Sequence, residues 1–307
     1  MLDIKFIREN TEKVKKGVAN KQLDPKIVDK VVDLDKKYRQ LLAEVEKLRG
    51  DRNKFAKEKK VEEGKNVKKK LQVIEPKLEK AEKEFQKRLE EIPNLPLAEI
   101  PVGKSEKENV EARKWGEPWK FSFKPKDHLE LGKSLGILDF EDGAKVSGSQ
   151  FYFLYGDGAL LELALIQFAI DLLSKEGFQP VITPDLAKSR YYLGTGYLPK
   201  GNEAQTYEIK KSDLGLIATA EVTLAGKHAD EVIPEDKLPL KYIGYSHCFR
   251  QEAGSYGKYS KGLYRVHQFT KAEMFIYCKP EDSDKMHKFL LEMEEKIYQS
   301  LGLPYRI

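Results

Sequence analysis

The sequence predicts an α+β protein with two dissimilar parts, an N-terminal antiparallel two-helix coiled-coil arm and a domain built on an antiparallel sheet. In the first third of the chain, apolar residues recur at alternating steps of four and three, which is the spacing of a coiled coil. Segments of alternating polarity, typical of strands, occur only beyond Trp115. The charge divides in the same way, with a net of +7 over residues 1–100 and −2 over the rest of the 307 residues. That length suits about two domains.

The coiled-coil spacing defines two helices of an arm over about residues 27–92. Its apolar positions are Ile27, Val31, Leu34, Tyr38, Leu41, Val45, Leu48 and Phe55, with Arg52 in one slot, and then Val67, Leu71, Ile74, Leu78, Ala81, Phe85, Leu89 and Ile92. Residues 57–66 contain Gly64 and Asn66, so we expect the turn there. Pro76 predicts a local kink. Residues 3–20 predict a separate short helix near the base of the arm.

Basic side chains gather at the far end of the predicted arm. Residues 47–70 hold eleven basic and four acidic side chains. A solvated coiled-coil surface usually mixes the two signs, so this excess favours a surface that binds nucleic-acid phosphates. The candidate contacts are Arg49, Arg52, Lys54, Lys57, Lys59, Lys60, Lys65, Lys68, Lys69 and Lys70.

The boundary between the two parts follows the arm. Three prolines, Pro93, Pro96 and Pro101, precede a polar run, so we expect a helical domain over 1–104 and a second domain over 105–307. No apolar stretch reaches the length of a membrane span and no signal-peptide core opens the chain, which predicts a cytoplasmic protein without membrane contact. Neither GxGxxG nor GxxxxGK[ST] occurs, and the two cysteines, Cys248 and Cys278, form no CxxC pair.

Residues 243–276 contain the charged groups that indicate a site. We expect strands over 243–250 and 263–276, which would place Arg250 and Glu252 on one strand face. Phe269 and Glu273 would share a face of the second strand with Arg265, and Lys271 would add a further cation. Charges gathered on a sheet face need partners or a ligand. From spacing alone, a surface hairpin laced with salt bridges is the alternative.

Three short motifs carry a resemblance to a known family. Residues 249–252 (FRQE) and 265–269 (RVHQF) with Glu273 resemble motif 2 of the class II aminoacyl-tRNA synthetases. Residues 177–184, which follow an amphipathic helix over 158–175, resemble motif 1, the dimer-forming element. The segment Thr219-Ala220-Glu221 resembles the serine-binding TxE segment, and with the basic arm it narrows the resemblance to the seryl-tRNA synthetase family.

The resemblance implies a role for each matching residue. It implies serine binding by Thr219, Ala220, Glu221, Arg250 and Glu273, ATP binding by Arg250, Gln251, Glu252, Arg265, Val266 and Phe269, catalysis by Arg250, Glu252 and Arg265, and dimer contacts by Gly177, Phe178 and Pro184. The implied reaction joins serine to ATP as seryl-adenylate, with Mg²⁺ on the phosphates, and then transfers the seryl group to tRNA(Ser) or tRNA(Sec) bound by the arm. The motif 2 loop, 255–261, would lie near the tRNA acceptor end.

Members of the family continue past the position of residue 307 into motif 3 and the magnesium ligands, so no metal-binding residue is expected in this chain. We therefore expect an N-terminal fragment with little or no adenylate formation. Two alternatives are a non-catalytic paralogue that binds tRNA or a protein partner, and a coiled-coil interaction protein whose second part is only a scaffold.

Overall fold

The computed structural model describes residues 2–197, 206–252 and 261–307. They form two compact units, Met1–Glu111 and Ala112–Ile307, where the sequence suggested a boundary between 104 and 105. Within the described ranges no helix is long and apolar enough to cross a membrane.

The base of the first unit is a small helical core. Two short helices, α1 (Ile4–Glu9) and α2 (Thr11–Asn20), pack against the start of α3 (Lys26–Lys57) and the end of α4 (Val61–Leu89). The prediction of one helix over 3–20 is wrong, because Asn10 leaves helical geometry with φ −128° and separates α1 from α2. Its side-chain amide donates to the Phe6 carbonyl, which caps the end of α1. The buried residues of this core are Ile7, Val14, Val18, Val28, Val31, Phe85, Leu89 and Ile92.

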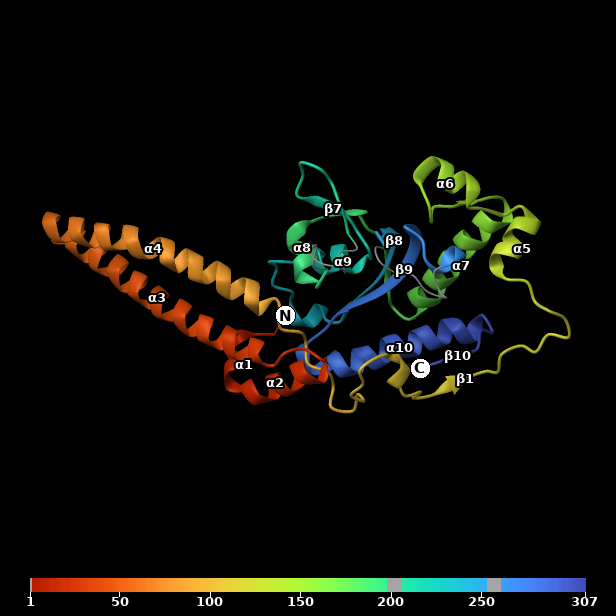
Figure 1. The fold of residues 1–307 in the computed structure, drawn as a ribbon, viewed down its shortest axis with the longest axis horizontal. Helices are drawn as coiled ribbons and strands as arrows, with labels where there is room; N and C mark the ends of the chain where they lie inside the picture. The colour runs from red at the N-terminus through yellow and green to blue at the C-terminus, as the bar shows by residue number, and fades with distance from the viewer. Residues whose placement is uncertain (1, 198–205, 253–260) are drawn as a thin grey trace. The chain divides into compact units, whose positions relative to one another are not determined.

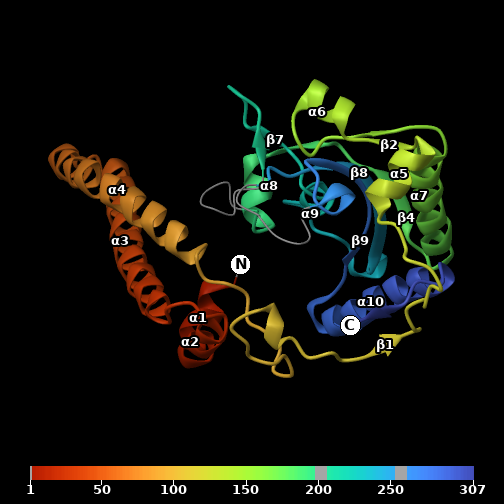
Figure 2. The ribbon, with the colours of Figure 1, turned by 45° about the vertical axis from the view of Figure 1, so that its right-hand side comes forward.

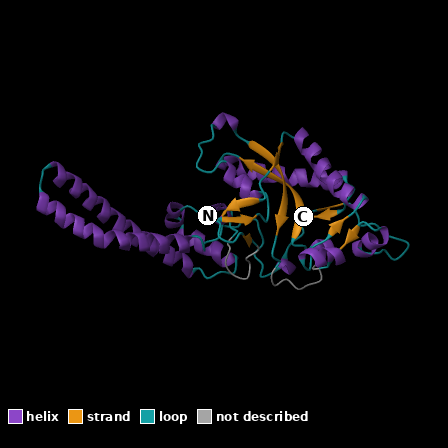
Figure 3. Cartoon of the chain, turned by 90° about the horizontal axis from the view of Figure 1, so that it is seen from above, coloured by secondary structure: helices purple, strands orange, loops and turns teal. Residues whose placement is uncertain are grey.

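The arm is the antiparallel pair of α3 and α4 (Figures 1 and 3). The predicted seam is confirmed along α4, where Val67, Leu71, Ile74, Ala81, Phe85 and Leu89 are all buried. The predicted turn over 57–66 is too long, because α3 ends at Lys57 and α4 already begins at Val61. Gly64 is tolerated in the first turn of α4 at a cost of about 1 kcal/mol relative to alanine. Pro76 lies inside α4.

A sheet of three strands in the order β4-β8-β9 forms the centre of the second unit. Here β4 (Gln179–Ile182) pairs parallel with β8 (Leu240–Phe249), and β8 pairs antiparallel with β9 (Gln268–Tyr277) over ten residues each. The expected strand over 263–276 therefore begins five residues too early. A short 3₁₀ turn, Gly262–Tyr264, precedes β9 instead.

Different helices cover the two faces of this sheet (Figure 2). On one face, α7 (Asp157–Lys175) and α10 (Ser283–Ser300) bury Leu173, Phe178, Ile243 and Met293 in one core cluster. On the other face, α9 (Glu221–Lys227) packs Leu224 against Tyr242. Because neighbouring residues of a strand point to opposite faces, Tyr242 and Ile243 belong to different layers. The predicted helix over 158–175 is confirmed as α7.

Three smaller sheets accompany it among the described residues of the second unit. The strands β5 (Leu186–Lys188), β7 (Leu214–Leu216) and β6 (Tyr207–Glu208) form one sheet beside α8 (Ser189–Gly194). The strand β2 (Leu138–Asp139), between α5 (His128–Leu135) and α6 (Glu141–Ser147) in the chain, pairs with β3 (Phe153–Leu154), which follows α6. The strand β1 (Lys114–Trp115) pairs with β10 (Tyr305–Arg306). Further 3₁₀ turns are Glu106–Glu108, Glu235–Lys237 and Pro280–Asp282.

Candidate active site

The register of the β8–β9 hairpin puts a set of polar side chains on the sheet face that α9 covers. Gly244 lies opposite Glu273, Ser246 opposite Lys271, and Cys248 opposite Phe269. A side chain at position 244 would press on Leu224 and Ala220, at 2.9 and 3.1 Å from its Cβ. The glycine therefore lets the segment 219–221 approach the sheet where Glu273 projects.

Four residues at this place form one hydrogen-bonded group, which we call the carboxylate cluster: Thr219, Glu221, Lys271 and Glu273. The Lys271 ammonium donates to Glu273 Oε1 at 2.9 Å and to the Thr219 hydroxyl at 2.5 Å. Glu273 Oε2 accepts from the Thr219 hydroxyl and from the Glu221 backbone N–H, the latter at 2.9 Å. Its members come from two segments more than fifty residues apart.

The carboxylate cluster lies largely out of solvent. Thr219 and Ala220 have no exposed surface, and the Glu273 side chain is 19% exposed. Burial raises the pKa of Glu221, the neighbouring Glu273 carboxylate raises this pKa further, and Lys271 partly opposes the shift. Tyr197 lies nearby, and its pKa is raised by burial and then by Glu221. Nothing in the sequence singled out Tyr197, whereas Lys271 was noted only as a cation.

Arg250 follows directly after β8 and is held through its backbone. Its N–H donates to the His267 carbonyl at 2.9 Å, and His267 Nδ1 lies 2.8 Å from the Arg250 carbonyl oxygen. The guanidinium lies over the Phe269 ring, 5.1 Å from its centre. The structure thus brings Arg250 and Phe269 together.

Glu252 and Arg265 meet by a different route from the one predicted. The prediction that Arg250 and Glu252 share a strand face is wrong, because β8 ends at Phe249 and Glu252 has φ +49°. Arg265 precedes β9, so it does not share the strand alternation of Phe269 and Glu273 either. Instead Arg265 Nη1 donates to Glu252 Oε2 at 2.8 Å.

Two other predicted ATP contacts lie close to this pair. The Gln251 amide donates to the Thr206 carbonyl at 2.9 Å, and Val266 is 5% exposed. The expected motif 2 loop, 255–261, lies outside the described residues except for Lys261, which donates to Asp127 at 2.6 Å.

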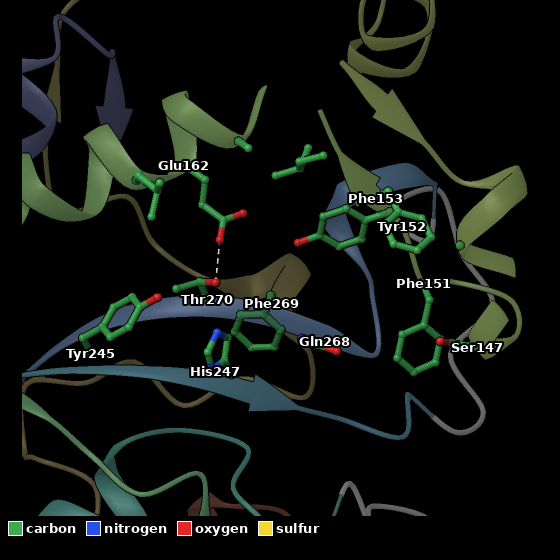
Figure 4. Close-up of a pocket in the computed structure, with 14 residues that line it drawn as sticks. Ser147, Phe151, Tyr152, Phe153, Glu162, Tyr245, His247, Gln268, Phe269 and Thr270 are labelled. Carbon is green, nitrogen blue, oxygen red and sulfur yellow. Dashed lines mark hydrogen bonds between the residues drawn. The ribbon is translucent and has the colours of Figure 1, made fainter. Parts of the chain in front are cut away.

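The opposite face of the same hairpin carries a cavity of about 510 Å³ (Figure 4). Tyr245, His247 and Thr270, which alternate with the residues that face α9, line it from the two strands, and Phe269 of the predicted ATP site lines it as well. The Thr270 hydroxyl donates to Glu162 of α7 at 2.5 Å. The sequence did not indicate this cavity, whose walls come from α6, residues 151–154, α7 and the hairpin.

The three predicted dimer residues have different environments. Gly177, two residues after the end of α7, has φ +83°, and Phe178 is buried with its ring stacked on Phe289. Pro184, just after β4, is exposed. The large exposed apolar surface nearby belongs to other residues: Leu160, Leu161, Leu163 and Leu165 of α7 and Ile182 of β4.

The ten predicted nucleic-acid contacts all lie on the distal half of the arm, on α3, α4 and the turn between them. Three of them have carboxylate partners at 2.8 Å within the arm, since Arg49 pairs with Glu75, Lys60 with Glu58, and Lys65 with Glu62. These pairs are exposed, so each is weak. The tip keeps its positive excess, because Glu58 and Glu62 are already counted among the four acidic side chains of residues 47–70 and Glu75 offsets only one further charge.

Comparison with known proteins gives a family-model match in each unit. The family model described as the seryl-tRNA synthetase N-terminal domain matches residues 1–96, and the class II core domain shared by the G, H, P, S and T synthetases matches 206–307. The chain is 49% identical to the serine–tRNA ligase of Dictyoglomus turgidum and 47% identical to that of Rubrobacter xylanophilus. It is matched over its whole length and covers 75% of each relative.

Two solved structures resemble the whole chain. Seryl-tRNA synthetase from Pyrococcus horikoshii, complexed with ATP, superimposes with a TM-score of 0.88 at 38% identity, and 76% of that chain is covered. The cytoplasmic serine–tRNA ligase of Naegleria fowleri, in complex with AMP, gives 0.84 at 32% identity and 74% coverage. The family models and these two structures therefore indicate the same protein family.

Proposed function

The chain belongs to the seryl-tRNA synthetase family of class II aminoacyl-tRNA synthetases, and on that premise we propose that its carboxylate cluster binds serine beside an ATP site formed by Arg250, Glu252, Arg265 and Phe269. The observation that carries this proposal is the meeting of Thr219, Glu221 and Glu273 at one point on the sheet. Two carboxylates and a hydroxyl suit a small zwitterion with an ammonium and a hydroxyl group.

The proposed orientation of serine follows from the charges. Glu221 faces the ammonium, Glu273 accepts a hydrogen bond from the hydroxyl, and Arg250 holds the carboxylate. The guanidinium lies over Phe269, and Arg250, Glu221 and Glu273 all act electrostatically on Tyr197, which supports a place for Arg250 between the proposed serine and ATP sites. A planar guanidinium can bind the serine carboxylate and an α-phosphate oxygen together.

The proposed reaction requires no nucleophile from the protein. A serine carboxylate oxygen attacks the α-phosphorus, the bond to the β-phosphate oxygen breaks, and pyrophosphate leaves with the electron pair. Arg250 aligns the two reactants and stabilises the charge that builds on the α-phosphate. For Phe269 to stack on adenine, the guanidinium that now covers its ring must turn toward the phosphates. Arg265, held near the site by Glu252, is the second cation available to the phosphates.

We expect ATP to bring Mg²⁺ on its phosphates. Across the described ranges no group of three or more His, Cys, Asp or Glu side chains is placed to hold a metal ion.

We further propose that the arm tip binds tRNA(Ser), and tRNA(Sec) if it shares the same backbone shape. The tip is basic, exposed and poor in aromatic side chains, which suits recognition of phosphates and shape rather than of splayed bases. A homodimer through α7 and β4 would cover their exposed apolar side chains. We place the protein in the cytoplasm, the compartment of translation.

The relatives extend over about a third more length than the matched segment, and we propose that these 307 residues alone form little or no adenylate. Serine-dependent exchange of pyrophosphate into ATP measures this directly, and clear exchange by the 307-residue chain would contradict it. The alternative, a non-catalytic protein that binds tRNA or a protein partner through the arm, predicts no binding of serine or ATP either.

Ligand binding tests the site itself. We would titrate the chain with a non-hydrolysable sulfamoyl analogue of seryl-adenylate by calorimetry. Arg250→Met should weaken binding by about 100-fold, because it removes charge-assisted hydrogen bonds to the acyl carbonyl and to the negatively charged sulfamate, which take the places of the serine carboxylate and the α-phosphate. Arg306→Met, which removes an exposed arginine of β10, is the matched control and should bind as wild type does. Equal affinity of the Arg250 variant and the control would refute the assigned site.

A further inference from the structure

Lys271 lies at the centre of the carboxylate cluster, yet the proposed binding of serine leaves it without a role. It projects from the middle of β9, and its side chain is 27% exposed. Its ammonium contacts Glu273 at 2.9 Å and the Thr219 hydroxyl at 2.5 Å. A lysine placed this tightly between a serine-binding threonine and a serine-binding glutamate must affect what the pocket accepts.

The hydrogen bonds of Glu273 leave little room for a ligand. A carboxylate has about four acceptor positions. Lys271 occupies one on Oε1, and the Thr219 hydroxyl and the Glu221 N–H occupy Oε2. About one position is left, which is enough for a single hydroxyl donor.

The ammonium of Lys271 has a complementary capacity. It carries three N–H donors. In the part of the chain that the structure describes, two of them are directed to Glu273 and Thr219. The third donor and the remaining acceptor position of Glu273 belong to groups 2.9 Å apart, so one ligand oxygen can engage both.

Charge balance allows Lys271 to stay in place when serine enters. The empty site contains two carboxylates, Glu221 and Glu273, and two cations, Lys271 and Arg250. Serine adds one charge of each sign, so the total is unchanged. Its ammonium then pairs with Glu221, whose pKa burial and Glu273 have raised, and need not displace Lys271 from Glu273.

We propose that Lys271 is a specificity-determining residue of the serine site, whose third N–H donates to the serine hydroxyl oxygen while that hydroxyl donates to Glu273. This inference rests on the proposed serine site. Lys271 and Glu273 together thus recognise the serine hydroxyl as both a hydrogen-bond acceptor and a hydrogen-bond donor. Alanine would leave both the ammonium and the carboxylate without that partner, and a thiol is a weak partner for either.

The test compares Lys271→Met with the exposed control Lys285→Met on α10. The ligands are sulfamoyl analogues of seryl-, alanyl- and 2,3-diaminopropionyl-adenylate, titrated by calorimetry. In Lys271→Met the preference for seryl over alanyl should fall by about 10-fold or more. The diaminopropionyl ligand carries an ammonium, which donates but does not accept. It should gain affinity relative to the seryl ligand once the Lys271 charge is gone, and the control should change neither ratio.

The outcomes separate this inference from the proposed function. A wild type that prefers the seryl ligand, with both ratios unchanged in Lys271→Met, overturns the role of Lys271 and leaves the serine site standing. Equal loss of all three ligands would show that Lys271 only supports the pocket, which also overturns it. A wild type without preference for the seryl ligand overturns the serine site and Lys271 together. If Lys271→Met does not fold, Lys271→Gln is judged by the same ratios.

Discussion

The arm and the hairpin of the central sheet both gather charge, but they do so in opposite ways. On the arm, the basic residues of the tip are close in sequence and exposed, and the carboxylates that pair with Lys60 and Lys65 lie two or three residues away. In the carboxylate cluster, Thr219 and Glu221 reach partners 52 to 54 residues away, and the contacts lie in a half-buried pocket.

This difference determines what each charge can do. Exposed charges are screened by water and salt, so a single one contributes little and many are needed for binding. A charge in a half-buried group is already paired, and removing one partner leaves the others unsatisfied. The arm should therefore respond to its total charge, and the cluster to single atoms.

Reversing the charge of the tip should give the largest effect. We would change Lys57, Lys59, Lys60, Lys68, Lys69 and Lys70 to Glu and measure tRNA(Ser) binding as a function of salt. If the six side chains contact phosphates, affinity near physiological salt should fall by about 10³-fold or more, and the slope of log K against log salt should decrease by about 4 or more.

The matched control moves the same number of reversals to exposed lysines near the base of the arm: Lys13, Lys16, Lys21, Lys30, Lys36 and Lys37. Both variants have the same net charge. If they lose affinity equally, only the overall charge matters and the tip has no special role.

The same contrast explains which parts of the structure could be predicted. The seam of the arm follows from a local repeat, and Val67, Leu71 and Ile74 are buried as predicted. The turn was placed too broadly, because Gly64 was taken as a helix breaker although it costs only about 1 kcal/mol within a helix. For the site, the motifs identified the right residues, but not which of them touch.

The pairing of Arg265 with Glu252 shows why contacts within the site escaped prediction. Strand alternation was extended to both residues, whereas Glu252 has positive φ and Arg265 precedes β9. Such departures depend on the surrounding structure and not on spacing. The contacts of Lys271 were not predicted for a related reason. Its partners follow only from the strand register, which places it opposite Ser246, and from the approach of Thr219.

Asp35 of α3 resembles the residues of the carboxylate cluster, because its charge is buried and paired. It is 2% exposed and accepts from Arg8 of α1 at 3.2 Å and from Arg39 at 2.9 Å. Asp35→Ala should lower the free energy of unfolding by about 2 kcal/mol, because it removes the common partner of two arginines. Urea unfolding of the full chain, followed by circular dichroism, measures this change.

Asp33→Ala is the control for Asp35, since Asp33 is an exposed aspartate one half-turn away on the same helix. Its effect should stay within about 0.5 kcal/mol. Equally small effects of the two substitutions on the free energy of unfolding would mean that the burial of Asp35 does not matter for stability. The arm would then have no charge that resembles those of the carboxylate cluster.

The smallest effect concerns Glu221 and has opposite signs for folding and for binding. In the folded protein burial and Glu273 raise the pKa of Glu221, so the folded state favours the protonated form. Ionisation of Glu221 therefore destabilises the fold as pH rises above the ordinary carboxyl pKa, and the penalty is complete above the raised pKa. Glu221→Gln should raise the urea midpoint at pH 7 and leave it unchanged at a pH below the ordinary carboxyl pKa.

The same substitution should weaken binding of the seryl-adenylate analogue, because the ammonium of the ligand loses its charged partner. A variant that is less stable at pH 7, or one that binds the analogue as tightly as wild type, would show that Glu221 is a structural member of the pocket rather than a charge kept there for the ligand.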